Sequence, residues 1–347
     1  MRILLINDYL EKFGGTEILT YELFNKLRER GHQVKLIGET SGQDFKSFFL
    51  RIYNPKWYKR TRSEIKQFKP NIVHVQNCSR VLSTSTISAS LDSNVPVVMT
   101  IHDSNYLNHF KFTFNLYKLA KYLKIIIHRG VINRSKIYLV APSQLFKDKI
   151  SKVFYNKIKT IPNGVFIPLK TTNYSKEILF VGRLSREKGL QTISNNLNQI
   201  KEYKIIVLGE GPLKKELENK YKNINFLGFQ NPNNYYKNSS ILVYPTLAEE
   251  SFGLSIAEAM SYGLCVITSK KGATSELVKH METGLLFEPG NEKDFQEKLD
   301  YLLKNPSEIK RMGKNAREFV KKNFDWNKVI KQYEHLYKEV IKDQKIK

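Results

Sequence analysis

The chain has 347 residues, of which 41% are hydrophobic, so it is long enough to build two domain cores and is not expected to be disordered. Its two cysteines, Cys78 and Cys265, belong to no CxxC or Cys/His cluster, and no segment approaches roughly 18 consecutive apolar residues, which argues against a disulfide framework, a zinc site and a membrane-spanning helix. The formal net charge of +24 indicates either a lysine-rich composition or attraction to an acidic partner, such as an anionic lipid, a nucleic acid or a phosphorylated substrate.

The first half of the chain alternates short apolar runs with helical segments. One helix is predicted over Thr16–Arg30 and ends at Gly31. The apolar runs that we expect to form strands are Ile3–Ile6, Val34–Ile37, Ile72–Val75, Val97–Ile101 and Tyr138–Ala141. Strands that alternate with helices in this way favour a parallel sheet built from β–α units.

The second half of the chain repeats this plan. Its predicted strands are Ile178–Val181, Ile205–Leu208, Ile224–Leu227, Ile241–Tyr244 and Cys265–Thr268, which are continuous apolar runs typical of buried parallel strands. The polar stretch Asn163–Lys176 is interpreted as a hinge between the halves, and a charged amphipathic helix is predicted from Asn327 onward. The predicted fold is therefore α/β, with two doubly wound, Rossmann-like domains that face each other across a cleft and bind ligands beyond the carboxyl ends of their strands.

Two short motifs of the first half lie where such a site would be. Gly14 and Gly15 open a helix, where paired glycines let backbone amides approach an anion, although a plain tight turn explains the glycines equally well. This motif is neither GxGxxG nor a P-loop. His102 and Asp103 follow the fourth strand, where the imidazole could meet a sugar hydroxyl and the carboxylate could orient it; a cap on the following helix is the alternative.

Cations and glycines follow the first strands of the second half. Arg183 and Lys188 come after its first strand, at the predicted opening of a helix, and a planar guanidinium beside a compact ammonium suits a diphosphate. The alternative is a solvated charged loop. Gly209 follows the next strand and Gly228-Phe229 the one after, so these turns are expected to line the same edge and to hold a nucleobase.

The segment Tyr244–Met260 gives the strongest functional signal. A helix is predicted to begin near Phe252, which leaves the amides of Phe252–Leu254 unpaired and able to bind phosphate. Glu258 lies about one turn further among apolar residues, where a carboxylate needs partners such as ribose hydroxyls. Glu250 precedes the helix and could accept hydrogen bonds from a donor sugar. The alternatives are a helix-dipole acid for Glu250 and an exposed position for Glu258.

Taken together, these motifs resemble those of retaining glycosyltransferases of the GT-B fold, in the large group called family four. The resemblance extends over nearly the whole chain, and its most specific element is the Glu-x7-Glu from Glu250 to Glu258, in register with the Gly-Arg-x4-Lys-Gly of residues 182–189. Supporting motifs are GGTE at 14–17, HD at 102–103, PSQ at 142–144, NGV at 163–165, GEGP at 209–212, LGF at 227–229 and GLLF at 284–287. The resemblance implies an acceptor-binding domain over residues 1–165, a nucleotide-sugar-binding domain over 166–323, and a helix over 324–347 that returns to the first domain.

The resemblance also implies a role for each candidate residue. Glu258 would bind the ribose, while Glu250 and His102 would be catalytic residues beside the transferred sugar. The implied contacts to the donor diphosphate are Arg183, Lys188, Phe252, Gly253, Leu254 and Gly15. Neither a metal nor a cofactor is expected, because the nucleotide-diphosphate sugar is a substrate and its charge would be met by cations and a helix N-terminus.

Several mechanisms and functions fit the resemblance. Retention could follow front-face attack, in which a donor phosphate oxygen takes the acceptor proton, or double displacement, which needs a nucleophile. No convincing carboxylate nucleophile is visible, so the front-face route is favoured. A GT-B-fold epimerase or phosphorylase is an alternative, although the sequence has no recognisable pyridoxal-phosphate signature. A basic nucleic-acid-binding protein is a further alternative, but no known RNA or DNA module is present and no nucleic-acid partner is expected.

The excess positive charge is concentrated in two stretches of the first half that also contain aromatic residues. Ser104–Lys147 contains no Asp or Glu, and Phe45–Lys69 includes Trp57 and Tyr58 among its cations. These stretches are predicted to dock on an anionic membrane near a lipid-linked acceptor, with ordinary helix packing as the alternative. The expected setting is cytoplasmic, peripheral on the inner face of the cell membrane, in the transfer of sugar to a glycan or lipid during cell-surface polysaccharide or glycolipid synthesis.

Overall fold

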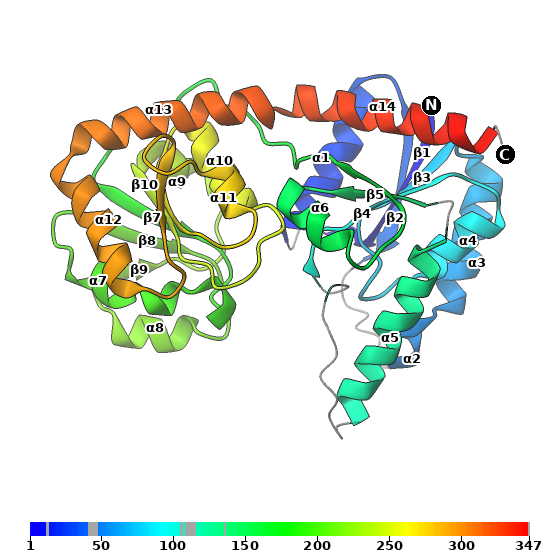
Figure 1. Ribbon diagram of the computed structural model, residues 1–347, viewed down its shortest axis with the longest axis horizontal. Helices are drawn as coiled ribbons and strands as arrows, with labels where there is room; N and C mark the ends of the chain where they lie inside the picture. Colours follow the sequence, from blue (N-terminus) through cyan, green and yellow to red (C-terminus); the bar gives the residue numbers. More distant parts are fainter. Residues whose placement is uncertain (12–13, 41–47, 105–106, 108–115, 135–136, 346–347) are drawn as a thin grey trace. The chain divides into compact units, whose positions relative to one another are not determined.

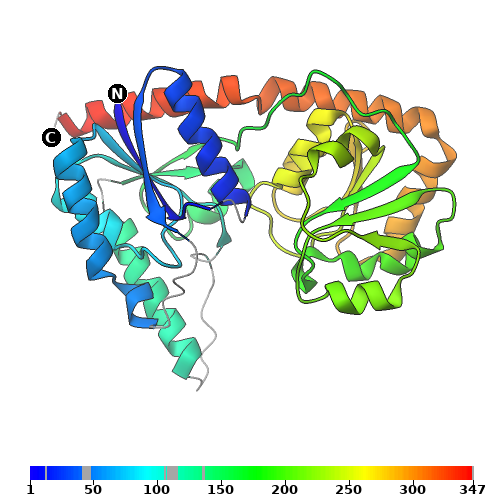
Figure 2. The same cartoon turned by 180° about the vertical axis from the view of Figure 1, so that it is seen from behind.

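The computed structural model describes residues 1–11, 14–40, 48–104, 107, 116–134 and 137–345. The chain divides into two compact units, Met1–Asn163 with Asn327–Lys347 (unit 1) and Gly164–Trp326 (unit 2). Each unit contains a six-stranded parallel sheet with helices packed against it (Figures 1 and 2). The predicted α/β fold with two Rossmann-like domains is therefore confirmed.

The sheet of unit 1 has the strand order β2-β1-β3-β4-β5-β6. Its strands are β1 (Arg2–Tyr9), β2 (Gln33–Glu39), β3 (Ile72–Val75), β4 (Val97–Thr100), β5 (Ile137–Ala141) and β6 (Lys157–Thr160). Its helices are α1 (Gly15–Glu29), α2 (Phe48–Ile52), α3 (Pro55–Phe68), α4 (Ser85–Asp92), α5 (Leu116–Ile132), α6 (Gln144–Ile150) and α14 (Trp326–Lys345). The five predicted strands are confirmed, whereas β6 was missed because this edge strand alternates exposed lysines with half-buried residues and has no apolar run.

Helix α3 shows how local sequence sets an element of unit 1. The Asn54 side chain accepts a hydrogen bond from the amide of Trp57 at 3.3 Å, and Pro55 occupies the first turn, where its missing N–H is not needed. The Trp57 ring is fully buried, and its indole N–H donates to Glu39 at 3.0 Å. The expectation that Trp57 belongs to an interfacial surface was therefore wrong, because the helical period turns this residue into the core.

The sheet of unit 2 has the strand order β12-β11-β10-β7-β8-β9. Its strands are β7 (Glu177–Val181), β8 (Lys204–Leu208), β9 (Ile224–Phe226), β10 (Ile241–Tyr244), β11 (Cys265–Ser269) and β12 (Gly284–Phe287). Its α-helices are α7 (Ser194–Gln199), α8 (Lys214–Lys220), α9 (Asn233–Asn238), α10 (Leu254–Tyr262), α11 (Thr274–Leu277), α12 (Glu292–Lys304) and α13 (Pro306–Asn323). The five predicted strands are confirmed here as well, and β12 is an additional edge strand.

The stretch interpreted as a hinge is largely fixed to unit 2. The amide of Thr172 donates to the carbonyl of Tyr262 at 2.8 Å, and the amide of Asn173 donates to that of Lys237 at 2.8 Å. Gly164 packs so closely on the Trp326 ring that a Cβ at this glycine would lie 2.3 Å from it. The chain therefore leaves unit 1 after residue 163 and re-enters it after residue 326, both times beside this glycine–tryptophan contact.

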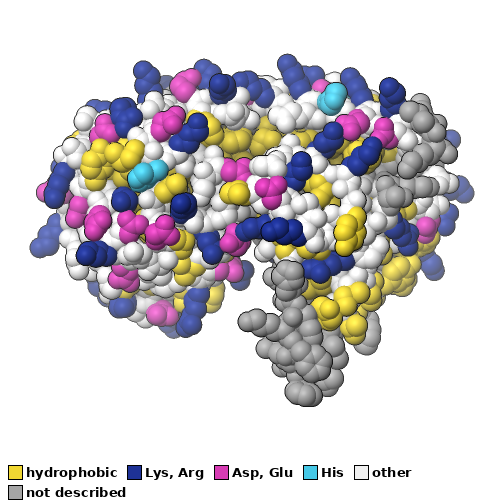
Figure 3. Space-filling view, in the orientation of Figure 1, with side chains coloured by type: hydrophobic (Ala, Val, Ile, Leu, Met, Phe, Trp, Pro, Cys, Tyr) yellow, Lys and Arg dark blue, Asp and Glu magenta, His cyan; other side chains and the backbone are white. Residues whose placement is uncertain are grey.

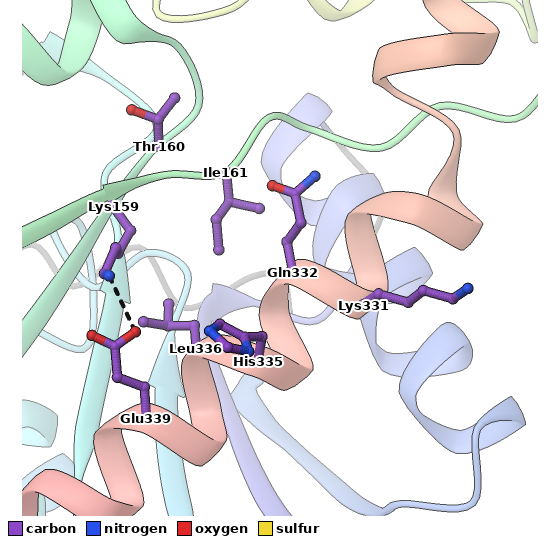
Figure 4. A pocket seen from close by; sticks show the side chains of 8 residues that line it. All are labelled: Lys159, Thr160, Ile161, Lys331, Gln332, His335, Leu336 and Glu339. Atoms are coloured by element: carbon purple, nitrogen blue, oxygen red, sulfur yellow. Dashed lines mark ion pairs between the residues drawn. The ribbon is translucent and has the colours of Figure 1, made fainter.

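Helix α14 packs on unit 1 through one buried face. Val329, Tyr333 and Tyr337 are 3% exposed or less, and Glu334 pairs with Arg30 through two contacts of 2.7 and 2.8 Å. A pocket of about 340 Å³ lies between this helix and β6 (Figure 4). It is lined by Lys159, Thr160, Ile161, Lys331, Gln332, His335, Leu336 and Glu339. None of the candidate site residues lines this pocket, and no described helix is both long and apolar enough to cross a membrane.

Candidate functional site

The loops that follow β7, β8 and β9 are joined at the carboxyl edge of the unit 2 sheet. The amide of Gly209 donates to the carbonyl of Gly228 at 2.7 Å, and the amide of Gly182 donates to that of Leu208 at 3.0 Å. Gly209 has φ +142°, and a Cβ there would lie 1.9 Å from the carbonyl oxygen of Gly182, so only glycine fits. The structure thus brings the two glycines predicted to line a nucleobase next to Arg183, which is exposed.

Lys188 lies beside this edge and is already paired. Its Nζ donates to Glu250 Oε1 at 2.7 Å and to the Tyr244 hydroxyl at 2.9 Å. Burial alone would lower the pKa of Lys188, but attraction to Tyr244 and Glu250 outweighs burial and raises this pKa above its ordinary value. The helix predicted to open at Lys188 is a 3-10 turn, Arg186–Lys188, which Gly189 closes at φ +74°, and a second 3-10 turn, Leu190–Thr192, precedes α7.

The carboxylate of Glu250 collects several donors on one oxygen. Besides Lys188, the hydroxyls of Tyr244 and Thr246 donate to Oε1 at 3.1 and 2.9 Å. Three donors on one oxygen fix the carboxylate in one orientation. Neither Tyr244 nor Thr246 was predicted to contact Glu250, because such residues at and just after the end of β10 are typical of ordinary strand ends.

The start of α10 differs slightly from the prediction. The helix begins at Leu254 rather than near Phe252, because Gly253 adopts φ +102° and stops the helical geometry from extending further back. The amides of Phe252, Gly253 and Leu254 donate to no described residue. These three amides therefore keep the hydrogen-bonding capacity that was expected of a helix start. The Phe252 ring is 3% exposed and packs edge-on against Phe324.

Glu258 is held on α10 among apolar neighbours. Burial raises the pKa of its carboxyl from 4.5 to about 7. Tyr236, which is fully buried, donates its hydroxyl to Glu258 Oε2 at 3.1 Å. The alternative reading of Glu258 as an exposed residue was therefore wrong, and Tyr236 is a partner that sequence analysis did not predict.

The candidates in unit 1 lie at the carboxyl edge of its own sheet. Gly15 begins α1, with Gly14 as the preceding cap, and Glu17 in its first turn has a pKa raised by burial. The ring of His102 donates from Nε2 to the Gln76 side-chain oxygen at 2.7 Å, and burial lowers the pKa of His102 to about 4. The sequence predicted Asp103 as the group that orients this ring; the structure adds Gln76, just after β3, as a direct partner.

Family comparisons agree with this architecture. The family model described as "Glycosyltransferase Family 4" matches residues 13–167. The model described as "Glycosyl transferases group 1" matches residues 168–319. The chain therefore belongs to the group 1 glycosyltransferases of family four.

Three characterised relatives show the range of proteins that this chain resembles. It is 28% identical over 292 residues to the sulfoquinovosyl transferase SQD2 of Arabidopsis thaliana, covering 77% of this chain but only 56% of the relative. It is 24% identical over 379 residues to the N-acetyl-alpha-D-glucosaminyl L-malate synthase of Bacillus anthracis, covering 96% of each chain. It is 33% identical over 148 residues to the D-rhamnosyltransferase WbpZ of Pseudomonas aeruginosa, covering 40% of this chain and 39% of the relative.

Solved structures share the GT-B fold over almost the full length. The sucrose-phosphate synthase from Thermosynechococcus elongatus superposes with a TM-score of 0.81 at 19% identity, with 99% of both chains covered. Anabaena HepE in complex with UDP-glucose gives a TM-score of 0.77 at 19% identity, with 97% of this chain and 99% of that chain covered. At these identities the likeness establishes the fold.

Proposed function

We propose that the chain transfers a sugar, with retention of configuration and without a metal ion, from a nucleotide-diphosphate sugar to a glycan or lipid-linked acceptor. One observation carries the donor part of this proposal. In unit 2, a paired lysine and glutamate, a half-buried second glutamate and a helix start whose amides donate to no described residue lie on one short segment of chain and in the turns beside it.

Each part of this cluster matches one part of such a donor. Lys188, Arg183 and the amides at the start of α10 supply positive charge and donors for a diphosphate. The carboxylate of Glu258 accepts hydrogen bonds from the two ribose hydroxyls, and that of Glu250 accepts from a hydroxyl of the transferred sugar. His102 contacts the same sugar near its anomeric carbon.

Front-face transfer needs no carboxylate nucleophile. The acceptor oxygen bonds to the anomeric carbon as the bond from that carbon to the donor phosphate oxygen breaks. The departing phosphate oxygen takes the acceptor proton, so the products are the glycoside and a nucleoside diphosphate. Cations and amides on the diphosphate stabilise the negative charge that grows on this leaving group.

Nucleotide binding tests the donor part of the proposal. Thermal shifts are measured with UDP, GDP and ADP and with their sugars, because a ligand that binds the folded state raises the melting temperature. One nucleotide series is expected to stabilise the wild-type protein and to lose its effect in Glu258→Ala. The matched control is Glu282→Ala, which removes an exposed carboxylate of the same unit. The proposal is refuted if no nucleotide stabilises the wild-type protein, or if both variants respond alike. Product analysis separates transfer from epimerisation, which consumes donor without an acceptor.

We also propose that unit 1 docks on an anionic membrane, and an exposed apolar face of α5 supports this. Ile126 and Ile127 lie about one helical turn after Leu123, and Leu123, Ile126 and Ile127 are 49%, 45% and 44% exposed. The ring of His128 contacts the carbonyl of Arg51 at 3.1 Å, which places the basic end of α2 beside this helix. Figure 3 shows hydrophobic side chains gathered over the described part of α5. Such a face, flanked by cations, suits the surface of an anionic membrane.

Liposome flotation tests the membrane part. Wild-type protein is expected to float with anionic vesicles at low salt and to be released by high salt. The double variant Ile126→Glu/Ile127→Glu is expected to stay in the soluble fraction, whereas Leu169→Glu, at a fully exposed leucine of unit 2, should float like wild type. Flotation that is equal for all three proteins, or absent in the wild type, would contradict membrane docking.

A further inference from the structure

The core of unit 1 contains a run of polar side chains where two strands meet α14. His74 on β3, Gln76 just after it and Thr100 at the end of β4 are exposed by 0%, 3% and 1%. These strands are parallel neighbours, with Val75 opposite Met99. Alternate residues of a strand share one face, so the three side chains form a polar row on the face that α14 covers.

The row continues to His102 at one end. His102 Nε2 lies 2.7 Å from the Gln76 carbonyl oxygen, which can only accept, so this ring nitrogen carries the hydrogen. The Gln76 amide nitrogen lies 3.0 and 3.3 Å from the two ring nitrogens of His74. An atom in the plane of the His74 ring could not lie this close to both ring nitrogens without clashing with the ring carbons beside them. The Gln76 amide therefore lies against the face of the His74 ring.

The other end of the row is fixed by α14. The Tyr337 hydroxyl lies 2.6 Å from His74 Nδ1, and Thr100 Oγ1 lies 2.8 Å from His74 Nε2. Tyr337 is fully buried and its ring also packs edge-on against the imidazole. The C-terminal helix therefore determines how the His74 ring is turned, and that ring in turn supports the Gln76 amide.

Stability does not explain this arrangement well. A fully satisfied polar network in a core contributes little net free energy compared with apolar side chains of the same size, and it is costly when one partner is lost. What such a network provides is a fixed geometry. One end of this network is His102, the ring that the proposed function places beside the transferred sugar.

We propose that Gln76, His74 and Tyr337 are positioning residues that hold His102 in one orientation and in the Nε2–H tautomer, with Nδ1 as its acceptor nitrogen. Helix α14, although far from His102 in the sequence, then helps to fix the orientation of this side chain. The inference rests on the proposed function for the purpose of His102, but the positioning itself can be measured without any substrate.

Nitrogen NMR of histidine-labelled full-length protein reads the tautomer directly, and His102→Gln assigns the signal among the 7 histidines. The wild-type ring is expected to show the Nε2–H pattern. Gln76→Met removes the acceptor oxygen and is expected to give a mixture of tautomers, and Tyr337→Phe should give the same change to a smaller extent. Gln76→Glu keeps an acceptor oxygen, so it should keep the tautomer while the new carboxylate raises the pKa of His102.

Tyr138→Phe is the matched control for Tyr337→Phe. The Tyr138 hydroxyl also bonds to α14, through Asp343, and its other described hydrogen-bond partner is Lys157, which is not part of the polar row. This control should therefore leave the His102 signal unchanged. The positioning is refuted if Gln76→Met keeps the pure Nε2–H pattern, or if the two tyrosine variants give the same spectrum.

Activity measurements distinguish the positioning of His102 from its proposed role beside the sugar. If His102 acts on the sugar, Tyr337→Phe should lower kcat about tenfold with little change in donor KM, since misorientation of a reacting group affects the chemical step. A changed tautomer with unchanged kcat would support the positioning and would refute the proposed role of His102. An unchanged tautomer would refute the positioning whatever the activity.

Discussion

Replacing Glu258 with Gln should stabilise unit 2 at alkaline pH while abolishing donor binding. The pKa of this carboxyl is raised by burial from 4.5 to about 7, so the unfolded chain ionises at a lower pH than the folded one. The Glu258 carboxyl therefore costs no stability below pH 4.5, where it is protonated in both states, and the free energy of unfolding falls as the pH rises toward and through 7. Gln does not ionise, so Glu258→Gln removes this loss.

The size of the effect follows from the two pKa values. Linkage gives a cost of about 1.4 kcal/mol at pH 5.5 and about 3 kcal/mol at pH 8. The variant should therefore gain about 2 kcal/mol over wild type between these two pH values, or about 4–8 °C in the melting temperature of a unit of this size. The amide can still accept the hydrogen bond from Tyr236, and any packing change it causes is the same at both pH values.

Melting temperatures of wild type and variant at pH 5.5 and pH 8 measure the effect. The transition of unit 2 is expected to be the one that an added nucleotide shifts in the wild-type protein. Glu282→Gln, at an exposed position, is the control and should show no pH-dependent difference from wild type. A difference between Glu258→Gln and wild type that is the same at both pH values would refute the raised pKa of the Glu258 carboxyl.

Three further outcomes are expected. Tyr244→Phe should raise the donor KM, measured by steady-state kinetics, about tenfold, because it removes one charge-assisted contact from Lys188 and one from Glu250. The control Tyr301→Phe removes the contact of Tyr301 on α12 with Glu308 and should leave the donor KM unchanged. Gly209→Ala should lower the free energy of unfolding in urea by at least about 3 kcal/mol, since its Cβ would lie 1.9 Å from a backbone oxygen. Gly290→Ala should cost less, because Gly290 also has a positive φ of +76° but a Cβ there would make only an ordinary contact of 3.7 Å with the Leu247 side chain. Lys188→Ala should weaken nucleoside diphosphate binding in calorimetry far more than nucleoside binding, and an equal loss for both ligands would contradict its diphosphate role.

The central strands of both sheets could be predicted because buried parallel strands are continuous apolar runs. Edge strands lack this signal. Lys157–Thr160 alternates exposed and half-buried residues, and Gly284–Phe287 was seen only as a motif. The hinge assignment depended on composition, which does not show that residues such as Thr172 are hydrogen-bonded to unit 2.

The charged members of the candidate site could also be predicted, whereas their uncharged partners could not. An acid such as Glu258 in an apolar stretch, or Lys188 after a strand, stands out from its neighbours. Tyr236, Tyr244 and Gln76 do not, because tyrosine and glutamine beside a strand are typical of ordinary packing. Their contacts join residues up to 56 positions apart, and only the folded chain brings such residues together.

Burial divides the candidate residues into two groups with different chemistry. It moves the pKa of Glu258 up to about 7 and that of His102 down to about 4, so both are wholly or partly neutral near pH 7. Lys188 differs from both, because attraction to Tyr244 and Glu250 outweighs the effect of burial on its pKa and keeps its amine positively charged. The fixed positive charge therefore lies where a diphosphate is proposed to bind, while Glu258 is only partly ionised and His102 is neutral near pH 7. A neutral imidazole can accept a hydroxyl proton in a hydrogen bond, which an imidazolium cannot, so the low pKa of His102 matches the acceptor role that its contact with Gln76 leaves to Nδ1.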